Sequence, residues 1–412
     1  MTVHIAGAGL AGLAAAVSSA RAGHEVVIHE AAKLAGGRCR SFYDSTMGRV
    51  IDNGTHVVLG SNSMTLKFLS EIGAGEAMTP AVSIGLPFIN LENGATWSMD
   101  IAGRGIYALI KTVPDIKTLV CLMRAGLCAL VRPEVTVAKA YGGLGEFYER
   151  LIVPLCTAIM NCTPEEAPAS LFARLIAVLS VGGRGALRPF IARTNLAESF
   201  IIPALDTIEE YGGEIRFCDP LTRIKTSDRV LRMANFRSGE VPIRRSDALI
   251  IALPPWALDS VLPHSTPRPP SHRTRAIVCT HFDLGRPLAT AGGMRLTGCI
   301  NAMAQWFAVT GSIISVTVSS AEKWMSYEAD DIAAMLWRDV STAFALQPTP
   351  PPPNRVIKER RATVEIAGRF GPRCAISQLL FAGGWTSALY HDTIEAAVTS
   401  GINAARCLVS PD

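Results

Sequence analysis

The 412 residues of the chain exceed what one compact core usually supports, which predicts two domains. A formal net charge of +4 without a basic tract argues against nucleic-acid binding, while 49% hydrophobic and only 18% charged residues suit an oily substrate. The ten cysteines include no CxxC or CxxH pair, which argues against a metal site or a disulfide framework and, with no signal peptide visible at the start, predicts a cytoplasmic protein.

The chain begins with an apolar run, residues 3–6, that opens into a glycine-rich turn. Gly7 provides the tight turn, Gly9 lets backbone amides approach a pyrophosphate, and Gly12 lets the following helix pack against the sheet. Leu10 and Ala11 stand at the start of that helix, whose N-terminal amides would face the negative charge. The turn therefore predicts a dinucleotide-binding site.

A second strand, residues 24–30, ends in Glu30 at about the spacing at which a carboxylate binds a ribose hydroxyl. Gly36, Gly37 and Arg38 follow. This E-x5-GGR pattern resembles that of the large flavoprotein superfamily that includes amine oxidases and phytoene desaturases. The resemblance implies FAD as the cofactor, with the Arg38 guanidinium near its phosphates.

The same resemblance implies an α/β fold: a Rossmann-like FAD-binding domain of the glutathione reductase type with an interleaved α+β substrate domain. We expect the FAD-binding domain to comprise residues 1–80, 190–262 and 354–412. We expect the substrate domain to comprise residues 81–189 and 263–353. The uncharged stretch 296–321 belongs to the latter, and its β-branched residues favour a buried antiparallel hairpin over a membrane-spanning helix.

Residues 50–59 resemble a strand with a polar break, and such a break lets the backbone come close to a ligand. Three residues of the break are assigned to cofactor binding: Asn53, Gly54 and Thr55. His56 follows them as a candidate catalytic residue. A surface turn with a hydrogen-bonded Asp52 is the alternative interpretation.

Residues 101–131 carry scattered basic side chains in strongly apolar sequence. A basic amphipathic helix here could lie on the inner face of the cytoplasmic membrane and open a path from lipid to the active site. The alternative is an ordinary helix of the second domain, since the apolar residues of 119–130 are not confined to one face.

Glu165 and Glu166 are the acids nearest to an expected pocket in the segment 151–174, and we consider both as candidate catalytic acids. Carboxylates that directly follow a proline are also common as solvated residues in the first turn of a helix. Further along, Leu221 begins a strand of the cofactor domain and is assigned to the FAD site.

The end of the chain closes the expected cofactor site. A strand over 379–382 leads into a turn at Gly383 and Gly384, and Thr393 and Ile394 begin a last helix. The N-terminus of that helix could face a phosphate or the flavin.

Over its whole length, the chain resembles the bacterial hydroxysqualene dehydroxylases, flavoproteins of hopanoid synthesis. The segments that carry this resemblance are 36–42, 51–56, 154–171, 252–256, 358–363, 385–386 and 393–395. It implies reduction of the allylic alcohol hydroxysqualene to squalene. A positioned acid would help the hydroxyl leave as water, an apolar pocket would shield the allylic cation, and reduced flavin would deliver hydride. His56, Glu165 and Glu166 are the candidates for that acid, and the electron donor is not identified.

Four positions depart from the family pattern. An acid is usual where Gly384 stands, proline where His391 stands, glycine where Ala396 stands, and glutamine where Thr55 stands. Two other functions fit the sequence: an FAD-dependent desaturase or oxidase of another isoprenoid or amine, and a non-catalytic prenyl-lipid carrier of the same fold. The intact glycine turn argues against the carrier.

Overall fold

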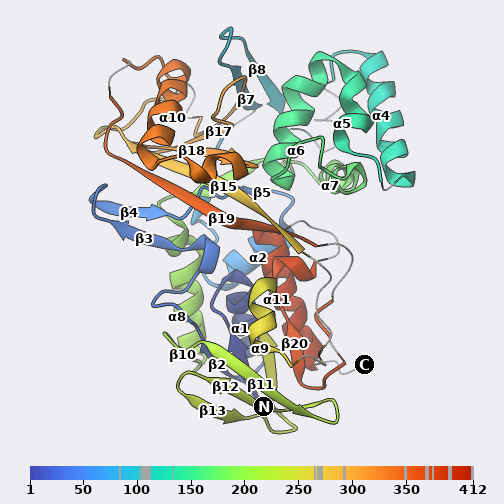
Figure 1. Cartoon of the computed structure of the whole chain (residues 1–412), viewed down its shortest axis with the longest axis vertical. Coiled ribbons are helices and arrows are strands. Elements are labelled where there is room, and N and C mark those ends of the chain that lie inside the picture. Colours follow the sequence, from blue (N-terminus) through green and yellow to red (C-terminus); the bar gives the residue numbers. More distant parts are fainter. Residues whose placement is uncertain are drawn as a thin grey trace.

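The computed structural model places most of the chain in regular helices and strands (Figure 1). It describes residues 1–82, 85–101, 103, 113–132, 134–263, 266, 272–290, 294–347, 350–366, 371–373, 375–387 and 392–409. His391 and part of the helix expected within 101–131 lie outside these residues.

A parallel sheet of five strands forms the core of the lower half of the molecule in Figure 1. Its order is β10 (Glu214–Arg216), β2 (Glu25–His29), β1 (Thr2–Ala6), β14 (Ala248–Ile251) and β20 (Leu379–Phe381). Every neighbouring pair in this sheet is parallel. The strands are short and mostly apolar because both faces of the sheet are covered: Ile5 belongs to the core cluster on one face, and Ala6 to the cluster on the other.

Helices cover one face of this sheet: α1 (Leu10–Arg21), α2 (Ser63–Glu71), α8 (Ile202–Glu210) and α11 (Ile394–Val409). The α1 and α11 helices pack closely at Gly401, where an added Cβ would overlap the carbonyl oxygen of Ala11. An antiparallel sheet and a short helix cover the other face: β11 (Leu221–Ser227), β12 (Val230–Phe236), β13 (Gly239–Pro242) and α9 (Pro255–Val261). This arrangement of helices, parallel sheet and antiparallel sheet is Rossmann-like and confirms the predicted fold class of the cofactor half.

A seven-stranded sheet dominates the upper half. Its order is β19 (Asn354–Ile366), β15 (His272–Asp283), β18 (Ile313–Ser319), β17 (Trp306–Thr310), β16 (Leu296–Ile300), β7 (Gly85–Asn90) and β8 (Thr96–Asp100). The hairpin expected within 296–321 is confirmed, because β17 and β18 pair antiparallel with Thr310 opposite Ile313. Buried residues of β15, β17 and β18 pack with α10 (Ala329–Ala343), which lies at the top of Figure 1.

A helical group stands beside the seven-stranded sheet: α4 (Ile116–Val131), α5 (Val137–Tyr141), α6 (Val153–Met160) and α7 (Ala169–Val181). A π-helical turn, η3 (Tyr148–Ile152), precedes α6, and another, η4 (Ala197–Ile201), precedes α8. Among the described residues, no helix combines the length and the apolar character that crossing a membrane requires.

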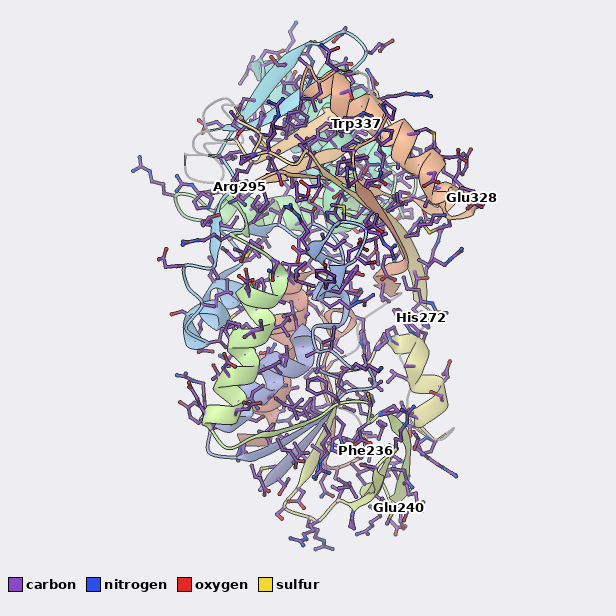
Figure 2. The ribbon with its side chains drawn as sticks, turned by 90° about the vertical axis from the view of Figure 1, so that its left-hand side faces the viewer. Phe236, Glu240, His272, Arg295, Glu328 and Trp337 are labelled. Carbon is purple, nitrogen blue, oxygen red and sulfur yellow. The ribbon has the colours of Figure 1, made fainter. Side chains whose placement is uncertain are left out.

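Two small sheets lie between the halves. One pairs β3 (Ser41–Asp44) with β4 (Arg49–Asp52), and the other has the order β5 (Val58–Leu59), β9 (Pro189–Ala192), β6 (Met78–Pro80). Seen from the side in Figure 2, the molecule is elongated, with Phe236 and Glu240 near one end and Trp337 near the other. The polar break expected within 50–59 is observed, because β4 ends at Asp52 and β5 starts only at Val58.

Candidate functional site

The glycine turn between β1 and α1 is built as the sequence predicts. Gly7 has a φ of +104°, and an added Cβ would lie 2.8 Å from the carbonyl oxygen of Ala252. A Cβ on Gly12 would overlap the carbonyl oxygen of Gly7. In contrast, a Cβ on Gly9 would meet no described atom within 4 Å. Two glycines are thus required by packing, while the third faces open space at the N-terminus of α1.

The other residues of the predicted dinucleotide site lie beside this turn. The carboxylate of Glu30 accepts hydrogen bonds from the backbone N–H groups of Ala8 (2.7 Å) and Ala32 (2.8 Å). Gly36 donates its N–H to the carbonyl oxygen of Ala8 at 2.8 Å and forms a parallel bridge with Gly9. The structure therefore brings the segment after β2 against the start of α1.

Arg38 lies in the 3-10 turn η1 (Gly37–Cys39) and binds a carboxylate from the end of the chain. Its guanidinium donates to both oxygens of Asp392, at 2.5 and 3.1 Å, and to the carbonyl oxygen of Ala362 at 2.7 Å. The Asp392 side chain is 2% exposed and also accepts the N–H of Val364 at 3.0 Å. Arg38 thus joins three distant segments, a contact that the sequence did not predict.

The remaining predicted cofactor residues fall into four places. Gly383 precedes η7 (Gly384–Thr386), and Ile394 begins α11 directly after Thr393. Asn53 is buried, and Gly54 and Thr55 follow it in the break after β4. Leu10 and Ala11 are buried in the first turn of α1, in one core cluster, whereas Leu221 is buried in the cluster on the opposite face of the parallel sheet.

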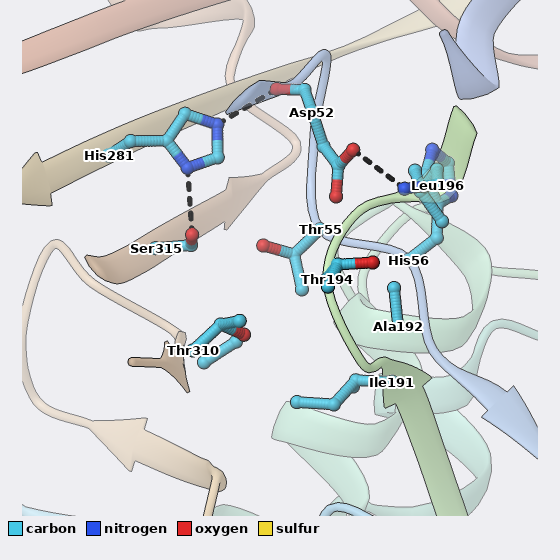
Figure 3. A pocket seen from close by; sticks show the side chains of 11 residues that line it. Asp52, Thr55, His56, Ile191, Ala192, Thr194, Leu196, His281, Thr310 and Ser315 are labelled. Carbon is cyan, nitrogen blue, oxygen red and sulfur yellow. Dashed lines mark hydrogen bonds between the residues drawn. The ribbon is translucent and has the colours of Figure 1, made fainter. Parts of the chain in front are cut away.

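A small pocket, partly open to solvent, lies where the break after β4 meets the seven-stranded sheet (Figure 3). The residues that line it are Asp52, Thr55, His56, Ile191, Ala192, Thr194, Leu196, His281, Ala308, Thr310 and Ser315. Arg295 braces one wall by donating to the carbonyl oxygen of Ala192 at 3.0 Å and to Oγ1 of Thr310 at 3.1 Å. The pocket thus has one side next to predicted cofactor residues and the other on the upper sheet.

Of the three predicted catalytic residues, His56 alone lines this pocket. Burial, together with the nearby positive charge of Arg38, lowers the pKa of His56 to about 4. The imidazole is therefore neutral near pH 7, which suits a hydrogen-bonding role better than proton donation.

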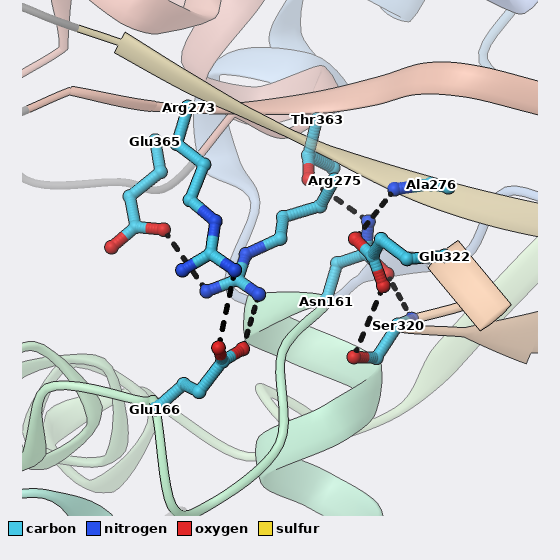
Figure 4. Close-up of polar contacts among 9 residues, drawn as sticks. All are labelled: Asn161, Glu166, Arg273, Arg275, Ala276, Ser320, Glu322, Thr363 and Glu365. Carbon is cyan, nitrogen blue, oxygen red and sulfur yellow. Dashed lines mark hydrogen bonds and ion pairs between the residues drawn. The ribbon is translucent and has the colours of Figure 1, made fainter.

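Glu165 and Glu166 are exposed and do not line the described pocket. Glu166 instead forms ion pairs with Arg275 and Arg273, and the hydrogen bond from Arg275 holds the pKa of the Glu166 carboxyl below its usual range (Figure 4). The Arg275 side chain is only 2% exposed and also pairs with Glu365 at 3.3 Å. Glu166 therefore neutralises a buried cation and joins the helical group to β15.

Asn161 reinforces the same junction (Figure 4). It is 2% exposed, adopts a φ of +49° at the end of α6, donates to Thr363 Oγ1 at 2.9 Å and accepts the N–H of Ser320 at 2.7 Å. Among the described contacts, Asn161 and Glu166 therefore attach the segment 154–166 to the upper sheet.

Sequence reasoning missed His281 and Ser315 as pocket residues. His281 Nδ1 lies 2.7 Å from Ser315 Oγ, and its Nε2 lies 2.9 Å from the carbonyl oxygen of Asp52. The signal available in the sequence was the Cys279-x-His281 spacing, which places both side chains on one face of a strand.

The open space at Gly9, the α1 N-terminus and the carboxylate of Glu30 fit the pyrophosphate and ribose of a dinucleotide. Together with the layered fold, these features define a dinucleotide-binding oxidoreductase of the flavoprotein type. Residues 10–85 and 295–409 match the family model described as flavin containing amine oxidoreductase.

Comparison with known proteins identifies the family more closely. The chain is 31% identical to hydroxysqualene dehydroxylase of Sinorhizobium fredii, over 99% of this chain and 98% of that one. It is 32% identical to hydroxysqualene dehydroxylase of Rhodopseudomonas palustris, over 98% and 97% of the two chains. A structure of putrescine oxidase bound to putrescine shares the fold, with a TM-score of 0.74 at 14% identity over 100% of this chain and 99% of that one. The chain belongs to the hydroxysqualene dehydroxylase family of flavin-containing amine oxidoreductases.

Proposed function

We propose that this chain catalyses the FAD-dependent reductive dehydroxylation of hydroxysqualene to squalene. The observation that carries this proposal is the similarity, over nearly the full length of both chains, to hydroxysqualene dehydroxylases. A local match would support only a shared cofactor fold. A match that spans the upper sheet and the helical group also supports a shared substrate class.

FAD would be held by the glycine turn and the residues around it. The pyrophosphate would take the open space beside Gly9, at the N-terminus of α1, and Glu30 would bind a ribose hydroxyl. When reduced, the flavin supplies the hydride that replaces the hydroxyl group.

The pocket next to the break after β4 would hold the reacting end of the alcohol. Ile191, Leu196 and Ala308 give part of its wall an apolar surface, which would keep water away from an allylic cation. His56 would contact the polar end of the substrate as a neutral imidazole, given its lowered pKa. Protonation of the leaving hydroxyl then requires another group at this pocket.

We also propose that α4 rests on an anionic membrane surface from which an oily substrate is taken. Its buried face consists of small residues, Ala125 and Ala129, while large apolar side chains point outward. The most exposed of them are Ile116 (71%), Met123 (61%), Leu127 (64%) and Val131 (75%). Exposed basic side chains accompany them: Lys117 and Arg124 on the same helix, and Arg132 directly after it. An apolar stripe flanked by cations fits the interface of an anionic bilayer.

Sedimentation with vesicles tests the membrane contact. The double variant Met123→Glu/Leu127→Glu should lose binding to vesicles that contain anionic lipid, while Tyr211→Glu, at an exposed aromatic residue that ends α8, should bind as the native protein does. Equal binding of both variants would contradict the proposed contact.

Product analysis tests the reaction. Purified protein loaded with FAD and supplied with a chemical reductant should convert hydroxysqualene to squalene, detected in an organic extract. Release of hydrogen peroxide in air with an amine or another isoprenoid, and no squalene, would instead establish the oxidase alternative.

A further inference from the structure

The pocket contains a buried imidazole whose two nitrogens are both engaged. His281 lies on β15, is 3% exposed and lines the pocket together with Ser315 of the neighbouring strand β18. Its Nε2 faces the carbonyl oxygen of Asp52 at 2.9 Å, so this nitrogen must carry a proton. Its Nδ1 faces Ser315 Oγ at 2.7 Å, and both side chains line the pocket (Figure 3).

A thiol lies behind this imidazole. Cys279 is two residues earlier on β15, on the same face, is 2% exposed, and its Sγ is 3.7 Å from His281 Nε2. Thr55 lies beside this sulfur, and its backbone N–H and hydroxyl help to lower the pKa of the thiol. Cys279 and Thr55 therefore tie the imidazole to the break after β4.

Opposite charges on His281 and Cys279 stabilise each other. Burial alone would lower the pKa of His281, but the attraction of the Cys279 thiolate and the hydrogen bond to Asp52 outweigh burial and raise it. Burial would raise the pKa of Cys279, but His281 and Thr55 outweigh it and lower it. Each group therefore shifts the other towards its charged form, His281 towards an imidazolium and Cys279 towards a thiolate.

The other acidic groups at the pocket are less suited to donate a proton. His56 is neutral near pH 7 because burial lowers its pKa to about 4. Burial raises the pKa of Asp52, but its Oδ1 accepts hydrogen bonds from Ser41 Oγ at 2.6 Å and from the N–H of Leu196 at 2.9 Å, and both bonds favour the ionised carboxylate. His281, whose Nδ1 contacts the Ser315 hydroxyl, is therefore the best-placed proton source at the pocket.

We propose that His281 and Ser315 form a proton relay that protonates the leaving hydroxyl of the substrate, with Cys279 as the residue that keeps His281 charged. This inference rests on the proposed function and names the acid that the reaction needs. Ser315 is the catalytic residue that touches the alcohol, and His281 is the acid behind it. Cys279 is a positioning residue that acts only through His281.

The step balances in atoms and charge. The Nδ1 proton of His281 passes to Ser315 Oγ while the Ser315 hydroxyl proton passes to the alcohol oxygen. The C–O bond breaks, and its electron pair leaves with the oxygen as water. The allylic cation then accepts hydride from a reduced flavin, so that alcohol, proton and hydride give hydrocarbon and water. His281 is left neutral and is protonated again from solvent.

The ionisable groups around His281 are few within the described residues. Cys279 comes from its own strand, Asp52 from β4, and Arg355 stands opposite His281 on β19, where it pairs with Asp44 at 3.4 Å. The His281 pKa lies above its usual value, so the rate of the protonation step should be maximal below that pKa and fall as pH rises through it.

Single-turnover kinetics test the relay. With enzyme whose flavin has been reduced anaerobically, Ser315→Ala and His281→Asn should form squalene about 100-fold or more slowly than native protein, the usual range for loss of a general acid. Cys279→Ala should retain activity at low pH, but its rate should decline at a lower pH than that of native protein. A purely structural defect would not move the pH profile.

Thr280→Val is the matched control. Thr280 lies between the two residues on β15, is fully buried on the opposite face, and its hydroxyl has no hydrogen-bond partner within the described part of the chain. This nearly isosteric variant should react at the native rate. If Ser315→Ala and His281→Asn also reacted at the native rate, the relay would be wrong although the proposed function stood.

Nitrogen NMR of protein labelled at histidine gives a readout that needs neither flavin nor substrate. The His281 signals, assigned by their loss in His281→Asn, should show both ring nitrogens protonated at pH 7 in native protein and a neutral ring in Cys279→Ala. A neutral His281 ring in native protein would overturn the relay. Absence of squalene from native enzyme, with the imidazolium present, would instead reject the proposed function.

Discussion

The carboxylate of Asp392 occupies the space that a side chain on Gly384 would need. A Cβ added to Gly384 would overlap Oδ1 of Asp392 and lie 3.1 Å from its Cα. The same carboxylate binds both terminal nitrogens of Arg38. The acid that the family resemblance leads us to expect at position 384 is thus absent, and a carboxylate from position 392 reaches the same point. The two positions therefore have to be considered as a pair.

Placing the expected acid at position 384 should destabilise the protein as long as Asp392 is present. Gly384→Asp would place two carboxylates in one buried space and should lower the free energy of unfolding by about 2–3 kcal/mol, through overlap and like-charge repulsion. The double variant Gly384→Asp/Asp392→Ala should recover most of that loss. Urea unfolding and the amount of bound flavin measure both effects. A single variant as stable as native protein would show that the two side chains do not compete.

The two glycines on either side of the α1 N-terminus should respond differently to the same substitution. Gly9→Ala has room for its methyl group and should change the free energy of unfolding without cofactor by less than about 0.5 kcal/mol. It should nevertheless weaken FAD binding at least 10-fold, because the methyl group would intrude on the pyrophosphate. Flavin titration followed by fluorescence measures this affinity.

Gly12→Ala is the counterpart, since its methyl group would overlap the carbonyl oxygen of Gly7. It should destabilise the protein by about 1–3 kcal/mol whether or not flavin is added. If Gly9→Ala bound FAD as tightly as native protein does, the open space beside Gly9 would not be the pyrophosphate site.

Glu166 should matter for stability rather than for the chemical step. Glu166→Gln leaves the buried guanidinium of Arg275 with only Glu365 as a charged partner and should cost about 2 kcal/mol of stability. Glu165→Gln, at the exposed neighbour, should be neutral. Thermal unfolding compares the two, and single-turnover rates of the folded proteins should match native. A Glu166→Gln variant of native stability that lost the chemical step would restore Glu166 as a catalytic candidate.

Stability should fall on mild acidification because of a buried histidine pair in the parallel sheet. Burial and the neighbouring His29 lower the pKa of His4 to about 4, below the value near 6.5 that an unfolded chain shows. As pH drops from about 6.5 towards 4, His4 therefore binds a proton in the unfolded state but not in the folded state. The titration of His4 alone should lower the free energy of unfolding by about 2 kcal/mol between pH 7 and pH 5.

Urea unfolding at pH 7 and pH 5 measures this dependence. His4→Gln cannot titrate and should show a smaller loss between the two pH values, even if its stability at pH 7 is lower. An unchanged loss in the variant would assign the pH dependence to other groups, such as His56.

Much of the fold could be predicted because its signals are local. Gly7 and Gly12 are dictated by contacts within a few residues or with an adjacent strand, and the β17–β18 hairpin follows from two β-branched runs joined at a glycine. Local signals also located the break after Asp52, where the pocket forms.

The polar contacts of the site could not be predicted, because they join distant parts of the chain. Arg38 and Asp392 are separated by 354 positions, and His281 and Asp52 by 229. Pairing of Ser315 with His281 depends on the register of β15 and β18, which no local pattern reveals. For the same reason, the sequence could not show that Glu166 pairs with Arg275, a buried arginine 109 positions away.

Reoxidation of the reduced flavin by the alcohol is the sharpest test of reductive dehydroxylation by this protein. Protein loaded with FAD would be bleached anaerobically with dithionite and then mixed with hydroxysqualene, while the visible spectrum is recorded and the product extracted. We expect the oxidised flavin spectrum to return and one squalene to form for each flavin reoxidised. A flavin that stays reduced in the presence of hydroxysqualene, with no squalene in the extract, would contradict it.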